Sequence, residues 1–487
     1  MATLSAVRPM PRATAGRQAV LDRATRSYDG GLFLSELARL VAVPSESEKP
    51  RGAPYLAFYL TEHMRPMLEK MGFVCEVLVN PALGGPLLLA ERIEDPDLPT
   101  VLIYGHGDVV RGLEDEWSDG LGPWRLVERM GRVYGRGVAD NKGQHLISLA
   151  AVRSVLAERG RLGFNAKCLL ETGGEIGSPG LREVCARHRD RLAADLLLAS
   201  AGPRIEPERP TLFLGSRGVL DFDLVVDLRA RGQHSGNWGG VLANPAVLLA
   251  HAVATIISAS GEIQIPELRP SAMAPTVRKM LGEAPLVATI GEPAIDAYWG
   301  EQGLAPIEKL LGWNSFEVLA WTAGSPRNPV KAIPPRASAH CQIRYTVDSD
   351  PCGFLPAIRQ ALDGRGLQAV QVRATDRPQV RATRTEPDHH WVTFARRSIE
   401  RSVGIAPAVL PNLGGSLPND CFTDLLGLPT IWVSHAHRGS GQHAADEHAL
   451  PQILREGLQI MAGLFWDLGE TSGPSAAIRR DRRRGIA

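Results

Sequence analysis

The sequence predicts an α/β protein that carries a second, α+β domain as an insertion. Three observations favour this fold class. The chain of 487 residues exceeds the usual size of one hydrophobic core. Its N-terminal part alternates helix-period stretches with short apolar runs, and its middle changes to strands with one polar face.

Helical and strand patterns alternate in the first part of the chain. Residues 31–43 and 55–72 have apolar residues at helical spacing and predict amphipathic helices. Continuous apolar runs that predict buried strands lie at 99–104, 166–171, 195–200 and 429–435. Buried strands that alternate with helices are typical of a parallel-rich sheet with helices on its faces.

The middle of the chain predicts an antiparallel unit. In DFDLVVDL (221–228) apolar residues alternate with aspartates, which indicates a strand that packs on one side only. Asn244 and Pro245 are favourable N-cap and first-turn residues for a helix that follows. A second alternating strand at 341–347, a helix (FLPAIRQALDG) and a last strand (LQAVQVRA) complete the pattern.

These patterns divide the chain into two domains. We expect a discontinuous α/β domain at 1–212 and 383–487, interrupted by a ferredoxin-like α+β domain at 213–382. Residues 261–315 are rich in Pro and Gly, and we interpret them as an elaboration of the inserted domain.

Composition excludes several classes of function. With 54 basic and 53 acidic residues the formal charge is +1, so we expect a small-molecule substrate and no nucleic-acid partner. Six cysteines without a CxxC pair favour a reducing compartment. No stretch resembles a signal peptide or reaches the ~20 apolar residues of a membrane span. We therefore expect a cytoplasmic protein without a membrane partner.

Polar residues with metal-ligand chemistry follow several of the apolar runs. His106 and Asp108, then Asp140, Glu175 and His443, each come just past such a run. Taken singly, these residues are typical of strand caps, a helix N-cap and solvent-exposed loops. Taken together, they lie on one rim of a parallel sheet, where ligands bind, and imidazoles and carboxylates are zinc ligands.

The order of five motifs carries a family resemblance. They are GHGD, GRGVADNKGQ, EIGSPG, GQHSGNWGG and GGSLP. With them the chain, over roughly residues 30–470, resembles the co-catalytic zinc amidohydrolases that include carnosinase, carboxypeptidase G, aminoacylase and succinyl-diaminopimelate desuccinylase. It is most similar to the carnosinase-like dipeptidase branch.

The resemblance implies a zinc-binding α/β domain, an inserted lid domain that also makes a homodimer, and up to two zinc ions per chain. The expected reaction is hydrolysis of the amide bond of a small peptide or N-acyl amino acid with a free carboxylate. His106 and Asp140 would bind one zinc, and Asp140 would bridge to a second zinc held by Glu175 and His443. Asp108 would orient His106.

The resemblance also implies substrate contacts. His234 would reach the substrate carbonyl, typically across the dimer, and stabilise the oxyanion. Arg344 would grip a substrate carboxylate, a bidentate task that suits its planar guanidinium. The loop that contacts the substrate backbone would consist of Gly414, Gly415 and Ser416. Lys331 stands where the family commonly has a small polar residue, and its ammonium would favour an anionic group.

Two positions depart from the family pattern. Gly174 stands where the family has the general base that deprotonates the attacking water, which contributes about 10²- to 10⁴-fold to the rate. Ala201 stands where the family has an aspartate ligand of the first zinc, so that zinc keeps only two protein ligands and reduced occupancy is expected.

Other residues are considered as replacements for the ligand missing at Ala201. Asp195 would lie at the opposite end of its strand, and Glu171 would require the loop to refold. His435 and His437, which flank the exit of the last strand, are the remaining candidates.

Three interpretations remain open. In the first, the chain is a hydrolase in which Gly174 and Ala201 are introduced, inactivating changes. In the second, it has lost water activation and serves a non-hydrolytic reaction on a carboxylate substrate, such as amide formation, cyclisation or elimination. In the third, it is a catalytically silent dimeric binding protein.

Overall fold

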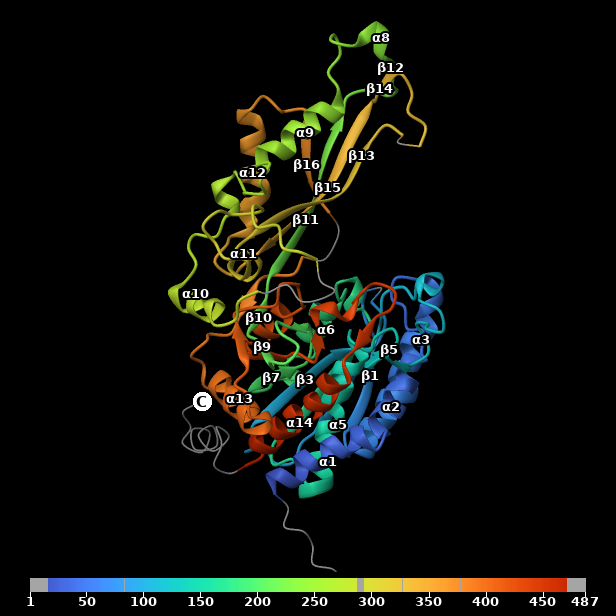
Figure 1. Cartoon of the computed structure of the whole chain (residues 1–487), viewed down its shortest axis with the longest axis vertical. Coiled ribbons are helices and arrows are strands. Elements are labelled where there is room, and N and C mark those ends of the chain that lie inside the picture. The colour runs from blue at the N-terminus through green and yellow to red at the C-terminus, as the bar shows by residue number, and fades with distance from the viewer. Residues whose placement is uncertain (1–15, 83, 287–292, 326, 376–378, 471–487) are drawn as a thin grey trace, which may run out of the picture.

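A computed structural model describes residues 16–82, 84–286, 293–325, 327–375 and 379–470, and its two largest sheets lie in separate parts of the molecule (Figure 1). The larger sheet has eight strands. In spatial order they are β1 (Val74–Leu78), β2 (Leu87–Arg92), β6 (Asn165–Glu171), β3 (Thr100–His106), β7 (Leu196–Ala199), β19 (Thr430–Val433), β9 (Thr211–Phe213) and β18 (Ala408–Leu410).

The centre of this sheet is parallel, as the apolar runs predict. Strand β3 pairs in parallel with β6 and β7, and β7 pairs in parallel with β19. The outer pairs β1–β2, β2–β6 and β19–β9 are antiparallel. All four continuous apolar runs of the sequence are therefore the central strands, and their carboxyl ends meet at one edge.

Two layers of side chains cover the faces of the large sheet. Val101 and Ile103 of β3 point into one apolar cluster, and Leu102 and Tyr104 point into another. The helices that contribute to the first cluster are α1 (Arg17–Asp29), α2 (Leu32–Val41), α5 (Lys142–Arg159), α13 (His390–Val403) and α14 (Pro451–Leu468). Helix α6 (Leu181–Arg187) packs in the second cluster.

The smaller sheet is antiparallel, in agreement with the alternating pattern at 221–228. Its strands are, in spatial order, β13 (Ser315–Ala323), β15 (Arg336–Tyr345), β11 (Gly218–Asp227) and β16 (Val370–Ala374). Phe222, Leu224 and Val226 of β11 are fully buried under α9 (Pro245–Ile256) and α12 (Phe354–Gly364).

Two segments differ from the sequence expectation. The single helix expected at 55–72 is divided into α3 (Ala53–Phe58), a π-helical turn (Tyr59–Met64) and α4 (Arg65–Lys70). This division precedes Pro66, which has no amide hydrogen to donate to a helical carbonyl.

The segment read as an elaboration of the inserted domain contains α10 (Pro275–Gly282) and α11 (Pro306–Leu311). Buried side chains of both helices, including Leu281 and Leu311, pack in the second cluster of the large sheet. This part of the chain therefore bridges the two sheets, and the domain boundaries at 213 and 382 stay a prediction.

Short elements complete the described chain. They are α7 (Arg189–Leu192), α8 (Ser235–Trp238), β4 (Val127–Arg129), β5 (Arg132–Tyr134), β8 (Pro203–Arg204), β10 (Gly215–Ser216), β12 (Gln233–His234), β14 (Ala332–Ile333), β17 (Thr383–Arg384), β20 (Ala436–His437) and β21 (His448–Ala449). Among the described helices, none is both long and apolar enough to cross a lipid bilayer.

Candidate metal centre and active site

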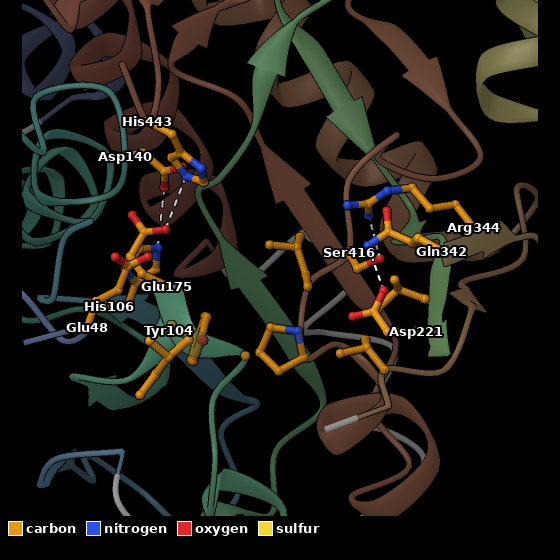
Figure 2. Close-up of a pocket in the computed structure, with 17 residues that line it drawn as sticks. Glu48, Tyr104, His106, Asp140, Glu175, Asp221, Gln342, Arg344, Ser416 and His443 are labelled. Carbon is orange, nitrogen blue, oxygen red and sulfur yellow. Dashed lines mark hydrogen bonds and ion pairs between the residues drawn. The ribbon is translucent and has the colours of Figure 1, made fainter. Parts of the chain in front are cut away.

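Four of the predicted ligands converge at the carboxyl edge of the large sheet (Figure 2). His106 is the last residue of β3, and Glu175 lies in a short turn directly after the neighbouring strand β6. Asp140 precedes helix α5, and His443 lies in the loop that follows β19 and β20. The parallel order of the central strands brings these separate chain segments to one place.

The spacing of the four side chains fits a bound cation. His106 Nε2 lies 3.3 Å from Asp140 Oδ1, while His443 Nε2 lies 3.4 Å from Asp140 Oδ2 and 3.1 Å from Glu175 Oε2. Ligand atoms about 2.1 Å from a tetrahedral zinc ion are about 3.4 Å from one another. His106, Asp140 and Glu175 offer ligand atoms that all lie within 4.8 Å of one another, and His443 contacts both Asp140 and Glu175. Imidazoles and carboxylates are ligands of zinc and of similar transition metals.

Three carboxylates raise the pKa values of the two histidines of the site. Burial alone lowers the pKa of His106, but hydrogen bonds to Asp108 and Asp140 outweigh it and hold this pKa well above the usual range. Hydrogen bonds to Asp140 and Glu175 raise the pKa of His443 to about 10. The carboxylates therefore stabilise positive charge in the site. A divalent cation can supply this charge in place of the protons on the two histidines.

Asp108 contacts both the His106 ring and the loop that carries Glu175. Its side chain is fully buried, and Oδ1 lies 3.3 Å from His106 Nδ1. The backbone amides of Gly174 and Glu175 each donate to the same carboxylate at 3.0 Å. Asp108 thus positions the His106 imidazole and the loop that carries Glu175.

Gly174 packs directly against His106. A Cβ atom built at this position would lie 2.6 Å from His106 Cγ, which is closer than real Cβ contacts. Gly174 lines the cavity but supplies no proton-transferring group. A glutamate introduced at this position would displace the imidazole unless the loop also moves.

Ala201, the other departure, lies directly beyond β7. It is 4% exposed and packs in the second apolar cluster of the large sheet. Its methyl group therefore contributes to the core, and it is not among the described residues that line the cavity.

The four residues considered as replacement ligands all lie outside the described lining of the cavity. Asp195 Oδ2 accepts a hydrogen bond from the Thr100 amide at 2.7 Å, at the start of β3. Glu171 accepts hydrogen bonds from the Ser178 hydroxyl at 2.8 Å and from the Tyr104 hydroxyl. Both carboxylates lie outside the cavity lining that the described residues form.

The two histidines past the last strand are also outside the centre. His435 is fully buried and packs against Gly457 of α14. A Cβ atom added at Gly457 would lie 2.8 Å from His435 Nδ1. The His437 ring packs 5.2 Å from the His448 ring. Neither histidine belongs to the described lining of the cavity, so nothing in their surroundings replaces the ligand missing at Ala201.

The opposite wall of the cavity comes from the small sheet and one loop. Arg344 Nη1 donates to Ser416 Oγ at 3.0 Å, and Gln342 Nε2 donates to Asp221 Oδ1 at 2.9 Å. Figure 2 shows these groups facing the metal centre across a cavity of about 520 Å³. Gly414 and Gly415 immediately precede Ser416 in the same loop.

His234 and Lys331 are not brought to this cavity in the same chain. They lie together on β12 and beside β14, where the Ser235 amide donates to the Lys331 carbonyl at 3.0 Å. Figure 1 shows these strands at the tip of the small sheet, away from the large one. Both side chains are exposed.

Sequence reasoning missed several residues of the cavity, among them the polar residues Glu48, Asp221 and Gln342. Glu48 lies at the metal end (Figure 2), where Arg111 Nε donates to it at 2.7 Å. It follows no apolar run or motif, so the sequence carried no signal for it. The alternation along β11 identified the polar face that holds Asp221, but not the cavity that this face lines.

Comparisons with known proteins agree with this geometry. Residues 102–467 match the family model of peptidase family M20/M25/M40. The chain is 32% identical over 475 residues to the Beta-Ala-His dipeptidase of Mus musculus, which covers 90% of this chain and 93% of the mouse protein. It is 25% identical over 334 residues to the cysteinylglycine-S-conjugate dipeptidase of Corynebacterium striatum, which covers 66% of this chain and 70% of that protein.

Solved structures give the same result for the fold. Human carnosine dipeptidase 1 matches with a TM-score of 0.73 and 21% identity over 93% of this chain and 100% of that chain. The dipeptidase Dug1p of Saccharomyces cerevisiae matches with a TM-score of 0.78 and 20% identity over 94% of this chain and 100% of that chain. These findings confirm the resemblance to the carnosinase-like dipeptidases. The chain belongs to peptidase family M20/M25/M40, whose members are metal-dependent peptide hydrolases.

Proposed function

We propose that this chain is a zinc-dependent hydrolase of amide bonds in small peptides or N-acyl amino acids that have a free carboxylate. One observation carries the proposal: a cation-sized cluster of two histidines and two carboxylates faces Arg344 and Ser416 across one cavity of about 520 Å³. A cavity of this volume suits a small molecule. The metal end would act on the scissile carbonyl while the arginine binds the carboxylate.

The activities of the relatives support this substrate class. The mouse protein is a Beta-Ala-His dipeptidase, and the Corynebacterium striatum protein acts on a cysteinylglycine S-conjugate. A dipeptide is small and ends in a carboxylate, which is the group that a guanidinium binds in a bidentate manner.

The four candidate ligands, Arg344 and Asp108 each have a task in the proposed reaction. Asp140, Glu175 and His443, together with His106, would hold zinc, which supplies Lewis-acid polarisation of the carbonyl. Arg344 orients the substrate through its carboxylate. Asp108 keeps the His106 ring and the Glu175 loop in place through the hydrogen bonds described above.

Proton transfer is the weak point of this centre. Gly174 has no side chain, and loss of a positioned general base lowers a rate by about 10²- to 10⁴-fold. We propose that Glu48, which lies at the metal end, accepts the proton at reduced efficiency. Glu48 also forms an ion pair with Arg111 at 2.7 Å.

A homodimer completes the proposed site. His234 is exposed at the tip of the small sheet, too remote to serve the cavity of its own chain (Figure 1). Apolar side chains are exposed on the same part of the molecule, with Trp238 at 44%, Val241 at 74% and Leu319 at 53%. Such side chains are typical of an interface, which would bring His234 to the partner's cavity as an oxyanion donor.

We also propose a cytoplasmic location. All six cysteines of the chain are free in the structure. Free cysteines are typical of proteins that stay in a reducing compartment.

A non-hydrolytic reaction is the second candidate function. The observation that favours it is the close packing of Gly174 on His106, which leaves no room for a base while the substrate-binding wall stays intact. Such a site could hold a polarised carbonyl and exclude attack by water, as amide formation, cyclisation or elimination requires.

The test combines metal analysis with turnover. Protein purified without chelators would be incubated with zinc and with β-alanyl-histidine, cysteinylglycine and N-acetyl amino acids, and products would be followed by mass spectrometry. The proposal expects slow, chelator-sensitive hydrolysis that Glu48→Gln lowers further. Bound zinc without any hydrolysis would contradict it, and a non-hydrolytic product would establish the second candidate.

A further inference from the structure

We infer that a second cavity, next to the metal cavity, binds a large apolar or aromatic side chain on the residue whose carboxylate Arg344 holds, with Arg217 as a second cation for that carboxylate. This inference rests on the proposed function for the role of Arg344. It extends the proposal to a substrate class, namely peptides or N-acyl amino acids with an aromatic carboxyl-terminal residue.

The second cavity has a volume of about 550 Å³ and lies against the other side of Arg344. Arg344 lines both cavities, so its side chain is accessible from each of them. Apolar and aromatic side chains form much of the second cavity: Ile263, Trp299, Leu310, Trp313 and Phe316. This volume and lining suit a bound aromatic ring.

The charges of the cavity are arranged for one anionic group. Arg217 is 5% exposed, and its Nε donates to the Gly414 carbonyl at 2.9 Å. Burial lowers the pKa of Arg217 to about 9, and the nearby positive charge of Arg344 adds to this shift. No carboxylate of the described residues lies within ion-pair distance of either arginine, although the charge of Glu317 acts on Arg217 and that of Asp221 acts on Arg344.

Two other buried arginines of this chain form ion pairs with carboxylates. Arg136 pairs with Glu447 at 2.9 Å, and Arg204 pairs with Glu456. A buried charge without a partner is strongly unfavourable. Arg217 is buried and Arg344 is partly buried, and neither has a carboxylate in direct contact, so the two guanidinium groups can accept a carboxylate from a ligand.

The acidic groups of the cavity limit the ligand to a single carboxylate. Glu301 is engaged with Arg269 at 3.7 Å. Glu317 and Asp296 also line the cavity, and neither is ion-paired to Arg217 or Arg344 in the described residues. A ligand with several negative charges would be repelled by these acids, whereas an aromatic residue with one carboxylate would not.

Trp299 is held in position by backbone contacts. The Gly300 amide donates to the Ser260 carbonyl at 2.7 Å, and Lys309 Nζ donates to the Trp299 carbonyl at 2.6 Å. The indole ring lies so close to Gly261 that a Cβ there would be 2.6 Å from it. Gly261 also has a φ of +82°, so glycine suits this position for two reasons. The ring is thus a fixed wall of the cavity, with 44% of the residue exposed.

The test measures binding and does not require turnover. Zinc-loaded protein would be titrated by calorimetry with N-acetyl-L-phenylalanine and with N-acetyl-L-alanine. We expect the phenylalanine derivative to bind about tenfold more tightly, because its ring is removed from water. Trp299→Ala should reduce this preference to about threefold or less.

Trp321→Ala is the matched control, since Trp321 is 43% exposed on β13 but does not line the second cavity formed by the described residues. It should keep the full preference. Arg217→Lys should weaken binding of both probes by a similar factor, with thermal unfolding used to confirm that the variant is folded.

Equal affinity of the two probes for the unmodified protein would overturn the inference. Loss of the preference in Trp321→Ala as strongly as in Trp299→Ala would also overturn it. An absence of hydrolysis would affect only the proposed function, because the binding measurement does not depend on it.

Discussion

The rim of the large sheet and the facing wall from the small sheet form the same cavity by different means. On the rim, each predicted ligand follows a strand or precedes a helix of the core, and Asp108 ties two of these segments together. On the wall, Arg344 and Ser416 meet through one hydrogen bond between distant segments. The rim is therefore fixed by the fold, whereas the wall depends on how the small sheet is placed.

This difference separates the expected effects of substitution. Substitutions on the rim should weaken or abolish binding of the metal. Substitutions on the wall should weaken binding of the substrate and leave the metal bound. The largest effect is expected for Asp140→Ala, because Asp140 lies between both histidines at 3.3 and 3.4 Å. We expect loss of tightly bound zinc, measured by elemental analysis after gel filtration, and loss of detectable hydrolysis.

Asp223→Ala is a matched control for this substitution. Asp223 also contacts a histidine, His340, at 2.7 Å, but on the small sheet away from the cavity. The zinc content of the Asp223→Ala variant should equal that of the unmodified protein. Retention of zinc by Asp140→Ala would show that Asp140 is not a ligand.

Gly174→Ala tests how closely the rim is packed. Its Cβ would lie 2.6 Å from His106 Cγ, so the imidazole or the loop must shift. Overpacking of this kind lowers the free energy of unfolding by about 1–3 kcal/mol, and zinc occupancy should fall with it. Gly122→Ala, where no atom lies within 4 Å of the added Cβ, should leave the midpoint of thermal unfolding nearly unchanged. Equal midpoints for the two variants would contradict the packing described here.

Asp108→Asn should weaken zinc binding without abolishing it. An asparagine keeps one acceptor oxygen, so one of the two amides at 3.0 Å loses its partner and the His106 ring loses its ionised neighbour. Loss of such a supporting group reduces metal affinity by about 10- to 100-fold. Competition with a chromophoric chelator measures the change, and an unaltered zinc affinity would rule out this role.

Arg344→Lys should have the smallest effect of these substitutions, and it should weaken only the binding of the substrate. A lysine keeps the charge but lacks the planar, bidentate geometry of the guanidinium. We expect KM for a dipeptide to rise about tenfold, with zinc content unchanged. The same dipeptide with an amidated carboxyl terminus should be hydrolysed equally poorly by the unmodified protein and by the variant. A fall in zinc content would contradict the division between rim and wall.

Much of the rim could be predicted from the sequence because parallel strands end at one edge of a sheet, so ligands that follow such strands meet there. His106 and Glu175 follow buried strands whose parallel pairing was evident from their apolar runs. The fold class was predictable for the same reason. Asp108, expected to orient His106, also holds the loop at Gly174, a contact that sequence spacing alone did not reveal.

The second cavity could not be predicted because it depends on contacts between segments far apart in the sequence. Trp299 takes its position from the turn at Ser260 and Gly261, within a segment that composition described only as rich in Pro and Gly. The same segment sends Leu281 and Leu311 into the core of the large sheet. Periodicity within one segment cannot specify its partner in a different part of the chain.

Zinc stoichiometry tests the central claim most directly. Protein purified without chelators and dialysed against metal-free buffer would be analysed for metal beside His443→Ala. We predict one tightly held zinc per chain at Asp140, Glu175 and His443, a second that dialysis removes, and loss of the tight zinc in the variant. A folded protein that binds no zinc, or a His443→Ala variant that keeps the tight zinc, would contradict the account.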